Sequence, residues 1–444
     1  MANVLVHRGK EGIGDFIYSV LPQGNFHRIV LKPNWVKHQE LAEFPIEALV
    51  TSAEIIDLTI EACRAKYPHA ERITIGDVPL QTCDWELLCK QSGIDKLKTK
   101  YKHSHNPVVS FEDWRRERWE LNKGFMRLVS DAPGDLRGYV DVTIDEQSML
   151  EEISDNSKNF RVSDYDPQET VSHHKKGRHH YLISKTVLEA DLVINLPKMK
   201  THQKAGMTGA LKNLVGINGS KAFLVHHQKS RPGSLGDEFP PETSKLFYYQ
   251  ARLRELLQKR SRFLFKIGKF GWELIKKVRG IETIGTRHKL SGNFYIGSGS
   301  WHGNDSIWRM VYDLNLILLL ASSIDGKLQS TPQRTILCLM DGLVAGEGNG
   351  PLQPLPVKAD VLIASNNPFL LDFCAVRLMR FDWKKIRMLS NYKRFGFKEW
   401  SEFDPDNFPI SESGDTNKEN WISQVTGFLA PPGWINNIEL KDKQ

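Results

Sequence analysis

Short apolar runs that alternate with a helical pattern place the strongest constraint on how this 444-residue chain folds. Residues 27–31 (HRIVL) and 72–76 (RITIG) are short and rich in the branched side chains that favour strands. Between them, residues 51–54 (TSAE) match a capping box that opens a helix. Strands interleaved with helices predict a mostly parallel, layered sheet with helices on both faces. We therefore expect an α/β fold.

Three further strands and one helix extend this pattern. The strands are expected at residues 190–195, 335–340 and 360–364, and the helix at residues 369–379. Two long polar or mixed stretches separate these elements, and we interpret them as inserted cap regions. The chain then divides into the N-terminal part of the α/β core at 1–97, an insertion at 98–185, a core motif segment at 186–218, a basic helical insertion at 219–300, the C-terminal part of the core at 301–402 and an irregular tail at 403–444.

Composition and cysteine content exclude several classes of protein. With 40% hydrophobic and 25% charged residues, the chain has the balance of a globular protein rather than of a disordered or collagen-like one. Its 5 cysteines are far apart and form no C-x-x-C pair, so neither a disulfide framework nor an iron–sulfur cluster is encoded locally. No apolar run approaches the roughly 20 residues of a membrane-spanning helix, and the first residues lack a signal-peptide pattern. We expect a cytoplasmic protein.

Positive charge is concentrated in residues 245–289, which contain 13 Lys and Arg against 3 Asp and Glu. Apolar residues recur there at helical spacing among the lysines, so the segment could lie on an anionic membrane surface or contact a protein partner. A core-packing helix with a solvated basic face is the alternative that we favour, because Gly268 and Gly271 weaken an isolated helix by about 1 kcal/mol each. The segment has no recognisable nucleic-acid-reading motif, so nucleic acid is not an expected partner.

Polar clusters follow five of the expected strands. They are Lys32 to Asn34, Asp77, the run 195–202, Asp341 with Gly342, and the run 365–368. The carboxyl ends of parallel strands share one edge of a sheet, where ligands bind, so we expect the five clusters to converge. Turn formation would explain the Asn, Asp, Pro and Gly residues, but turns do not require Lys or His. We therefore favour a shared ligand site at this edge.

The densest cluster extends from residue 195 to residue 219 and combines lysines, a histidine and four glycines. Lysines beside backbone N–H groups that glycines leave accessible favour an anion such as phosphate or carboxylate. A glycine-rich turn followed by a helix with a solvated lysine face is the alternative. No Walker A or G-x-G-x-x-G sequence is present. We expect the anion to be bound by Lys32, Asn34, Asp77, Lys198, Thr208, Lys212 and Asn213, and the catalytic candidates are Lys200, His202 and His302.

Two more motifs carry carboxylates or a histidine. Asp341 and Glu347 lie in a glycine-rich stretch that we expect to be a loop after a strand, where they would ligate Mg²⁺ or Mn²⁺ or act as acid and base. His302 and Asp305 could form a pair, but an N-cap role for Asn304 or Asp305 fits the sequence equally well.

Histidines are concentrated between residues 173 and 227, which contain seven of the 15. The four histidines of the run 173–180 (HHKKGRHH) are typical of a metal-binding tract, but the positive charges of the adjacent Lys and Arg residues disfavour binding of a metal cation. We therefore expect this run to be a mobile basic loop. His226 and His227 are better candidates for a site, because they flank the densest cluster together with His202.

The run INLPKMKTHQKAGMTGALKNLVGING, with KPN upstream and DGLVAGEGNGP and NNPFLLDFCAV downstream, resembles the domain of unknown function 362 (DUF362) family over residues 32–379. The resemblance implies an α/β protein. Many members of the family carry appended ferredoxin-type cysteine motifs and are labelled iron–sulfur centre proteins, but this chain has no such motif, so that label is not carried over. The family name implies no reaction.

These patterns predict an intracellular enzyme that acts on a small anionic metabolite, phosphorylated or carboxylated, by group transfer with the help of a divalent metal ion. One alternative is a non-catalytic anion-binding accessory protein that docks on a membrane surface or a partner through residues 245–289. A redox-associated protein is the other alternative.

Overall fold

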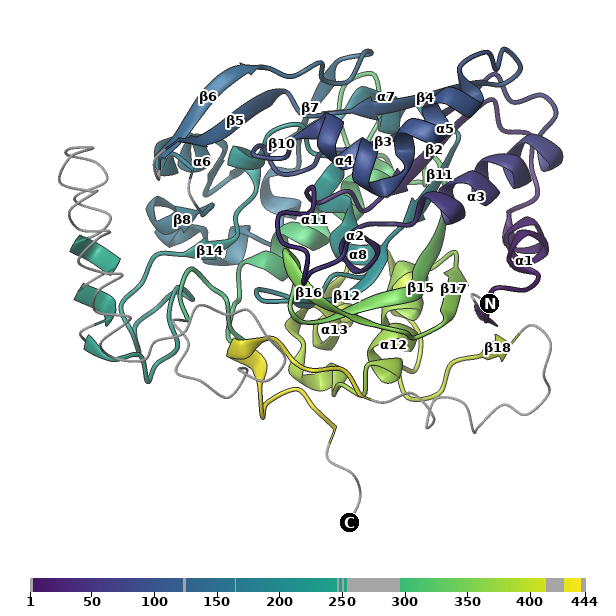
Figure 1. Cartoon of the computed structure of the whole chain (residues 1–444). Coiled ribbons are helices and arrows are strands. Elements are labelled where there is room, and N and C mark those ends of the chain that lie inside the picture. Colours follow the sequence, from purple (N-terminus) through teal and green to yellow (C-terminus); the bar gives the residue numbers. More distant parts are fainter. Residues whose placement is uncertain are drawn as a thin grey trace.

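The computed structural model describes residues 3–122, 125–163, 165–245, 247–249, 251–253, 296–412 and 427–440. In this part of the chain the largest element is a mixed, mostly parallel sheet of 11 strands (Figure 1). Its continuous order is β18 (Ile410–Glu412), β1 (Val4–Arg8), β17 (Val361–Ser365), β15 (Thr335–Asn349), β11 (Leu192–Leu196), β2 (Arg28–Pro33), β3 (Arg72–Asp77) and β4 (Val108–Asp113). The remaining three strands attach beside this path: β12 (Lys198–His202), β13 (Gly206–Met207) and β16 (Gln353–Val357). The predicted α/β fold is confirmed.

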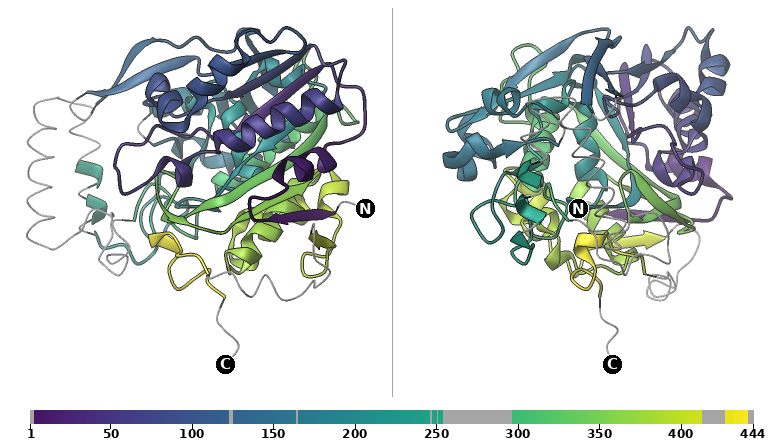
Figure 2. Two further views of the ribbon diagram at one scale, coloured as in Figure 1. Left: turned by 45° about the vertical axis from the view of Figure 1, so that its right-hand side comes forward. Right: turned by 60° about the vertical axis from the view of Figure 1, so that its left-hand side comes forward.

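Alternate residues of the central strands face two separate cores. In β11, Val193 packs into one hydrophobic cluster, whereas Leu192 and Ile194 pack into the other. The Leu192 side is covered by α1 (Ile13–Val20), α2 (Ile46–Leu49), α3 (Ala53–Lys66), α4 (Trp85–Ser92) and α5 (Ile94–Tyr101). The Val193 side is covered by α8 (Ala210–Asn213), α11 (Ile307–Leu320), α12 (Pro368–Leu378) and α13 (Arg387–Ser390). The sheet therefore lies between two helical layers, as the two views of Figure 2 show.

The unit β2–α3–β3 follows the sequence pattern closely. β2 and β3 pair in parallel, and α3 begins at Ala53, where Ser52 Oγ accepts a hydrogen bond from the backbone N–H of Glu54 (3.2 Å). The capping box expected at residues 51–54 is not formed, because Ser52 is the N-cap and Thr51 Oγ1 instead donates to the carbonyl oxygen of Leu196 (2.7 Å) and accepts from the N–H of Asn34 (2.8 Å). The start of this helix is thereby tied to the carboxyl ends of β2 and β11.

The strands expected at 190–195, 335–340 and 360–364 and the helix expected at 369–379 are present as β11, β15, β17 and α12. The predicted loop around Asp341 and Glu347 is wrong, because β15 continues through the glycine-rich stretch to Asn349. Pairing with β12 on one side and β16 on the other supplies backbone partners that extend the strand.

The predicted convergence of all five polar clusters is also wrong for the run 365–368. β17 is antiparallel to β15, with Val361 opposite Gly342 and Ser365 opposite Cys338. The chain after Ser365 therefore runs toward the opposite edge of the sheet, where Asn367 Oδ1 caps α12 by accepting from the N–H of Phe369 (2.9 Å). An apolar strand has the same sequence pattern whether it pairs in parallel or antiparallel, so the sequence alone does not predict the direction of β17.

The stretch 98–185 is not wholly separate from the core, because β4 lies within it and forms the edge of the central sheet beside β3. The rest of this stretch builds smaller units. They contain the strands β5 (Glu117–Asn122), β6 (Phe125–Asp131), β7 (Tyr139–Thr143), β8 (Phe160–Arg161), β9 (His174–Lys175) and β10 (Arg178–Ser184), and the helices α6 (Pro167–His173) and α7 (Lys185–Leu188). The β5–β6 hairpin lies at the top of Figure 1, and β8 pairs with β14 (His227–Gln228).

The run 173–180 is not the mobile loop that we expected. It forms the β9–β10 hairpin, whose turn contains Gly177 in the left-handed region (φ 69°). His174 and His179 are both fully buried, and burial lowers the pKa of His174 to about 3. His174 thus packs as a neutral core residue, and His179 Nε2 lies 3.0 Å from Glu151 Oε2, which the run of basic residues and histidines does not reveal.

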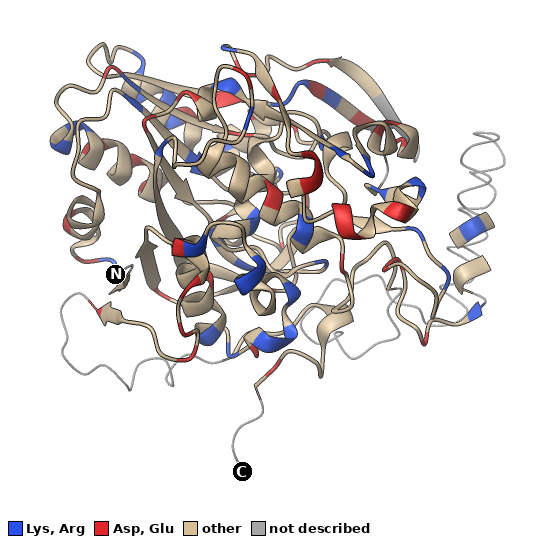
Figure 3. Cartoon of the chain, turned by 180° about the vertical axis from the view of Figure 1, so that it is seen from behind, with Lys and Arg blue, Asp and Glu red and all other residues tan. Residues whose placement is uncertain are grey.

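Figure 3 shows Lys and Arg residues interspersed with Asp and Glu residues along the described chain. The apolar stripe and basic helix expected within 245–289 lie almost entirely outside the described residues. In the described part of the chain, each helix is too short or too polar to traverse a lipid bilayer. Part of the expected irregular tail is ordered as β18, which pairs in parallel with β1 at the edge of the sheet, and α14 (Lys398–Ser401) precedes it.

Candidate functional site

Four of the polar clusters meet where β2, β3 and β11 end, beside the middle of β15. The parallel register places Lys32 beside Asn195 and Asn195 beside Cys338. The chain then passes from β11 into β12, which places Lys198 beside Asp341. The side chains brought together at this edge are all more than nine-tenths buried, and we call them the buried polar cluster: Lys32, Asp77, Asn195, Lys198, Lys200, His202, Thr208, Lys212, Asn213 and Asp341.

Lys32 and Asp77 form a completely enclosed ion pair. Lys32 Nζ lies 2.9 Å from Asp77 Oδ1 and also donates to the carbonyl oxygen of Pro33 (2.7 Å). Asp77 Oδ2 accepts from the N–H of Trp35 (2.6 Å). Burial lowers the pKa of Lys32, and the charge of Asp77 counteracts that shift. Gly216 makes room for the pair, because a Cβ there would lie 1.8 Å from Asp77 Oδ1 and 2.6 Å from Lys32 Nζ.

Three asparagine amides connect the strand ends to the segment after β13. Asn213 Nδ2 donates to Asn195 Oδ1 (2.7 Å), and Asn213 Oδ1 accepts from Asn34 Nδ2 (2.9 Å). Asn195 Nδ2 donates in turn to the carbonyl oxygen of Ala210 (2.9 Å). Asn213 therefore fixes α8 against β2 and β11. Asn34 is only partly buried, and its Oδ1 has no hydrogen-bond partner in the described part of the chain.

Asp341 and Glu347, the expected metal ligands, have protein partners. Lys198 Nζ lies 2.8 Å from Asp341 Oδ2, and the same oxygen accepts from the N–H of Ser52 (2.8 Å). Glu347 accepts from the N–H of Leu429 (2.9 Å), which belongs to a different part of the chain. Among the residues that the structure describes, no three His, Cys, Asp or Glu side chains are grouped closely enough to hold a metal ion. A cation at Asp341 would have to compete with the ammonium of Lys198.

Lys200 is fully buried and donates to the carbonyl oxygen of Leu49 in α2 (2.5 Å). Burial lowers its pKa well below the ordinary value, and the charges of Lys212 and Lys198 lower it further. An ammonium in this position has two more N–H groups than this one acceptor uses. Lys200 therefore has donor capacity beyond its hydrogen bond to Leu49.

His202 and His226 present ring nitrogens of opposite kind. His202 Nδ1 accepts from the backbone N–H groups of Lys204 (3.0 Å) and Ala205 (3.3 Å), so the proton of the neutral ring is on Nε2. His226 Nδ1 lies 2.7 Å from the carbonyl oxygen of Leu224, so its Nε2 is a proton acceptor. Burial, followed by the charge of Lys212, lowers the pKa of His202 well below its ordinary value. The two rings offer one donor and one acceptor, neither with a partner among the described residues.

Lys212 differs from the other lysines of the cluster. Its side chain is 8% exposed and makes no hydrogen bond or ion pair with the described residues. Burial lowers its pKa to about 7, and the charges of Lys221, Lys204 and Lys32 act in the same direction. Thr208 Oγ1 is also enclosed without a hydrogen-bond partner in this part of the chain.

Lys221 is a member of the site that sequence reasoning missed. It lies in a short turn (Lys221–Phe223), and its Nζ donates to the carbonyl oxygen of Val78 (2.8 Å). Burial lowers its pKa to about 7, with Asp77 acting against that shift. The sequence feature that could have indicated Lys221 is its position two residues after Gly219, the last residue of the dense cluster 195–219.

The site carries more positive than negative charge. Six lysines interact electrostatically through it, namely Lys32, Lys198, Lys200, Lys204, Lys212 and Lys221. The carboxylates among them are Asp77 and Asp341. Burying unbalanced charge costs free energy, which is why burial lowers the pKa values of Lys32, Lys200, Lys212 and Lys221. An anionic ligand would restore the balance.

His302 lies apart from the lysines. Its ring contacts Trp301 and Trp434, and burial lowers its pKa. Asp305 does not pair with it but binds Arg387 (2.7 Å) and other residues. The N-cap residue of α11 is Ser306 rather than Asn304 or Asp305, although Asn304 Oδ1 accepts from the N–H groups of Ser306 (3.1 Å) and Ile307 (3.0 Å) at the start of the helix.

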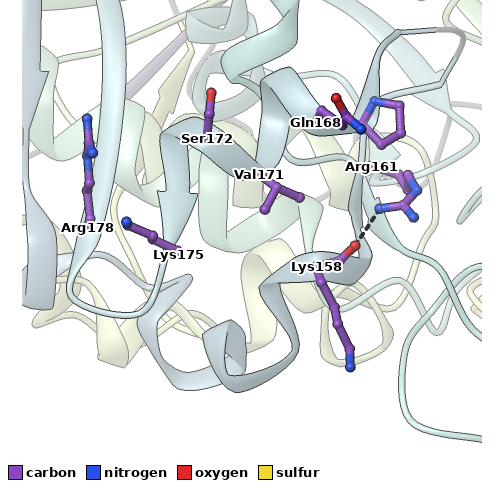
Figure 4. Close-up of a pocket in the computed structure, with 8 residues that line it drawn as sticks. Lys158, Arg161, Gln168, Val171, Ser172, Lys175 and Arg178 are labelled. Atoms are coloured by element: carbon purple, nitrogen blue, oxygen red, sulfur yellow. Dashed lines mark hydrogen bonds between the residues drawn. The ribbon is translucent and has the colours of Figure 1, made fainter.

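A second basic site lies at the surface, in an open pocket of about 630 Å³ that contains none of the predicted residues (Figure 4). Its lining residues are Lys158, Arg161, Pro167, Gln168, Val171, Ser172, Lys175 and Arg178. Arg161 is held in place by donating to the carbonyl oxygen of Lys158 (2.8 Å). The lining has four cationic side chains and no carboxylate.

Comparisons with known proteins identify a family but name no reaction. A thylakoid-associated protein of Synechocystis sp. (strain ATCC 27184 / PCC 6803 / Kazusa) is 23% identical over 242 residues, which are 54% of this chain and 48% of that protein. The chain thus spans about half the length of this curated relative. A family model described as a domain of unknown function (DUF362) matches residues 128–377, which include β11, β12, α8 and most of the buried polar cluster. Because this match covers more than half of the chain, the protein belongs to the DUF362 family.

Proposed function

We propose that this protein is an enzyme that binds a small anionic metabolite, phosphorylated or carboxylated, in the buried polar cluster. The observation that supports the proposal most strongly is the excess of six lysines, five of them buried, over the two carboxylates of Asp77 and Asp341. Buried charges are normally paired, and a phosphate or carboxylate is the complementary group. Group transfer is the reaction class that we assign to the site.

The side chains divide into supporting and ligand-facing groups. Lys32 and Lys198 are held by Asp77 and Asp341, so they shape the site and supply background charge. Lys200 would neutralise the anion and donate hydrogen bonds to it. His202 would donate from Nε2 and act as the acid or base, because a bound anion raises the pKa of a neighbouring imidazole.

Native mass spectrometry of the gently purified full chain, with metal analysis on the same sample, tests which molecule is bound. Titration calorimetry with inorganic phosphate and with pyruvate then measures affinity. We expect Lys200→Met to weaken binding roughly 10- to 100-fold, since a hydrogen bond to a charged group contributes about 1.5–3 kcal/mol. Lys358→Met is the matched control, because the Lys358 side chain is 80% exposed. Equal affinities of the two variants would refute the proposed site.

Assistance by Mg²⁺ or Mn²⁺ at Asp341 and Glu347 remains part of the proposal. The ion would have to displace Lys198 from Asp341, so metal binding should be weak without the anion and stronger with it. Calorimetry with MgCl₂ before and after saturation with phosphate tests this coupling. An absorption spectrum of the purified protein tests the redox alternative, because a bound chromophore would favour it.

A peripheral role at a membrane is the second candidate function. Two observations favour it: the relative is named as thylakoid-associated, and the surface pocket has four cationic side chains without a carboxylate. Flotation with anionic phosphatidylglycerol vesicles and with neutral phosphatidylcholine vesicles tests this role. Lys158→Ala/Lys175→Ala addresses the pocket, and Lys276→Gln/Lys277→Gln addresses the basic segment 245–289. Binding to neither vesicle would refute it.

A further inference from the structure

We propose that Lys212 is a nucleophilic amine that forms an imine with an aldehyde or ketone group of the anionic ligand. This inference rests on the proposed function, because it assigns a chemical class to the ligand of the same site. The ligand would carry a carbonyl group together with a carboxylate or phosphate, as in a 2-oxo acid or a phosphorylated aldehyde.

The first argument is the set of partners that the six lysines have. Lys32 and Lys198 bind carboxylates, and Lys200, Lys204 and Lys221 donate to oxygens of the protein. Lys212, in α8, makes no hydrogen bond or ion pair within the described residues. Thr208 Oγ1 is fully enclosed by protein and has no hydrogen-bond partner among the described residues. Lys212 Nζ is not enclosed in this way, and 8% of the residue is exposed. Among these lysines, Lys212 is therefore the one whose amine is unengaged and reachable.

The second argument is the state of that amine. Only a neutral amine attacks a carbonyl carbon. Burial and the neighbouring cations Lys221, Lys204 and Lys32 lower the pKa of Lys212 to about 7. At pH 7 about half of such amines are neutral, compared with about one in 3000 for an exposed lysine with a pKa of 10.5.

The third argument is the set of groups around the amine. The Lys212 nitrogen would bond to the carbonyl carbon while the C=O electron pair moves to oxygen, and Nε2–H of His202 would stabilise that oxygen. The nitrogen transfers its two protons to this oxygen by way of His226 Nε2 or water, and the C–O bond breaks to release water. Amine and carbonyl thus yield imine and water, with no oxidant or reductant.

Charge explains why the ligand should be anionic. The protonated imine carries the same positive charge as the ammonium, so a neutral aldehyde would leave the site as unbalanced as before. A carboxylate or phosphate in the same molecule would compensate for that charge. A neutral carbonyl compound such as acetone should therefore react much less than pyruvate or glyoxylate.

The experiment is reductive trapping with the full-length protein. The protein is incubated at pH 7 with pyruvate, glyoxylate or acetone and with sodium cyanoborohydride, which reduces an imine to a stable secondary amine. Peptide mapping then locates each adduct. We expect labelling by pyruvate at Lys212 to exceed that at the exposed Lys358 by at least about tenfold, from the difference in neutral fraction.

Lys221 is the internal comparison, because its pKa is also lowered to about 7 but its Nζ is bound to a carbonyl oxygen. Labelling spread equally over Lys212, Lys221 and Lys358 would overturn the inference, as would equal labelling by acetone and pyruvate. Lys212→Arg should abolish the principal adduct, and mapping of the wild-type chain keeps the test valid if that variant does not fold.

Phosphate binding distinguishes failure of the proposed anion site from failure of the proposed imine at Lys212. If calorimetry shows phosphate in the site and excess phosphate suppresses labelling at Lys212, both the anion site and the imine are supported. If phosphate binds but no adduct forms at Lys212, the imine is refuted and the anion site stands. If neither phosphate nor pyruvate binds, the proposed function itself fails.

Discussion

Replacing Asp77 with Asn tests how much the enclosed ion pair contributes to stability. The substitution keeps the shape of the side chain but leaves Lys32 Nζ, which is fully buried, without a counter-ion. Removing one partner of a buried ion pair typically lowers the free energy of unfolding by about 3–5 kcal/mol. Lys32 retains the oxygens of Pro33 (2.7 Å) and Asn213 (3.3 Å), so we expect a loss near 3 kcal/mol.

The variant should also have a characteristic pH dependence. In the wild-type protein the folded pKa of Lys32 already lies below 10.5, so the unfolded chain binds more protons between the two values and stability rises with pH there. Loss of Asp77 removes the charge that opposes the shift. The folded pKa falls further, and the window of rising stability widens toward lower pH.

Urea denaturation followed by circular dichroism at several pH values measures both effects. Asp95→Asn is the matched control, because the Asp95 side chain is 49% exposed in a 3.8 Å pair with Lys98, and we expect a change below about 0.5 kcal/mol. Lys32→Met combined with Asp77→Asn should recover part of the loss. A loss below about 1 kcal/mol for Asp77→Asn, or a double variant less stable than the single one, would refute the reasoning.

Three further predictions concern the same site. Gly216→Ala should lower the thermal midpoint in a melting experiment and weaken phosphate binding, because its Cβ would lie 1.8 Å from Asp77 Oδ1; an unchanged midpoint would contradict the packing. Phosphate affinity measured by calorimetry should fall as pH rises through about 7, since Lys212 and Lys221 both lose their charge there, and the Lys212→Met variant should show a smaller fall than the wild type. Burial raises the pKa of Asp372, which accepts from the N–H of Ala210 (2.6 Å), to about 8, so its folded form binds more protons than its unfolded form above pH 4. The contribution of Asp372 to stability should therefore fall between pH 4 and pH 8, and urea titrations over this range should show stability rising more, or falling less, with pH for Asp372→Asn than for the wild type.

The acid–base role proposed for His202 can also be tested directly. His202→Gln keeps a hydrogen-bond donor and acceptor but removes the ability to exchange a proton near neutral pH. Once native mass spectrometry has identified a ligand, this variant should bind it within a fewfold of the wild-type affinity and lose turnover. Retained turnover would refute the acid–base role of His202.

Local patterns in the sequence were sufficient to predict several strands and helices and the position of the buried polar cluster along the chain. The branched runs at 27–31 and 72–76 became β2 and β3, and the TSAE run marked the start of α3. The cluster of Lys, His and Asn residues after 195 likewise marked the edge at which buried polar side chains meet. These signals depend on neighbours within one or two turns, so they can be read along the chain.

Where those local patterns gave a wrong prediction, strand pairing between distant parts of the chain determined the structure. The glycine-rich stretch after Met340 looked like a loop, but β12 and β16 hold it as a strand, and its glycines allow close contact: a Cβ at Gly346 would lie 3.0 Å from the carbonyl oxygen of Ala48. The antiparallel direction of β17 likewise depends on which strands lie beside it, and it moved one polar cluster away from the site.

The sequence by itself determined that this is an α/β chain with a lysine-rich motif after its central strand, because strand and helix periods and residue chemistry are local properties. Only the tertiary structure decided what each lysine does. Burial depends on residues far away in the chain, as when Asp77 meets Lys32 and Asp341 meets Lys198. Those contacts hold some lysines as paired supports and leave Lys212 unpaired, at a lowered pKa of about 7, because a side chain's surroundings are set by the fold and not by its sequence neighbours.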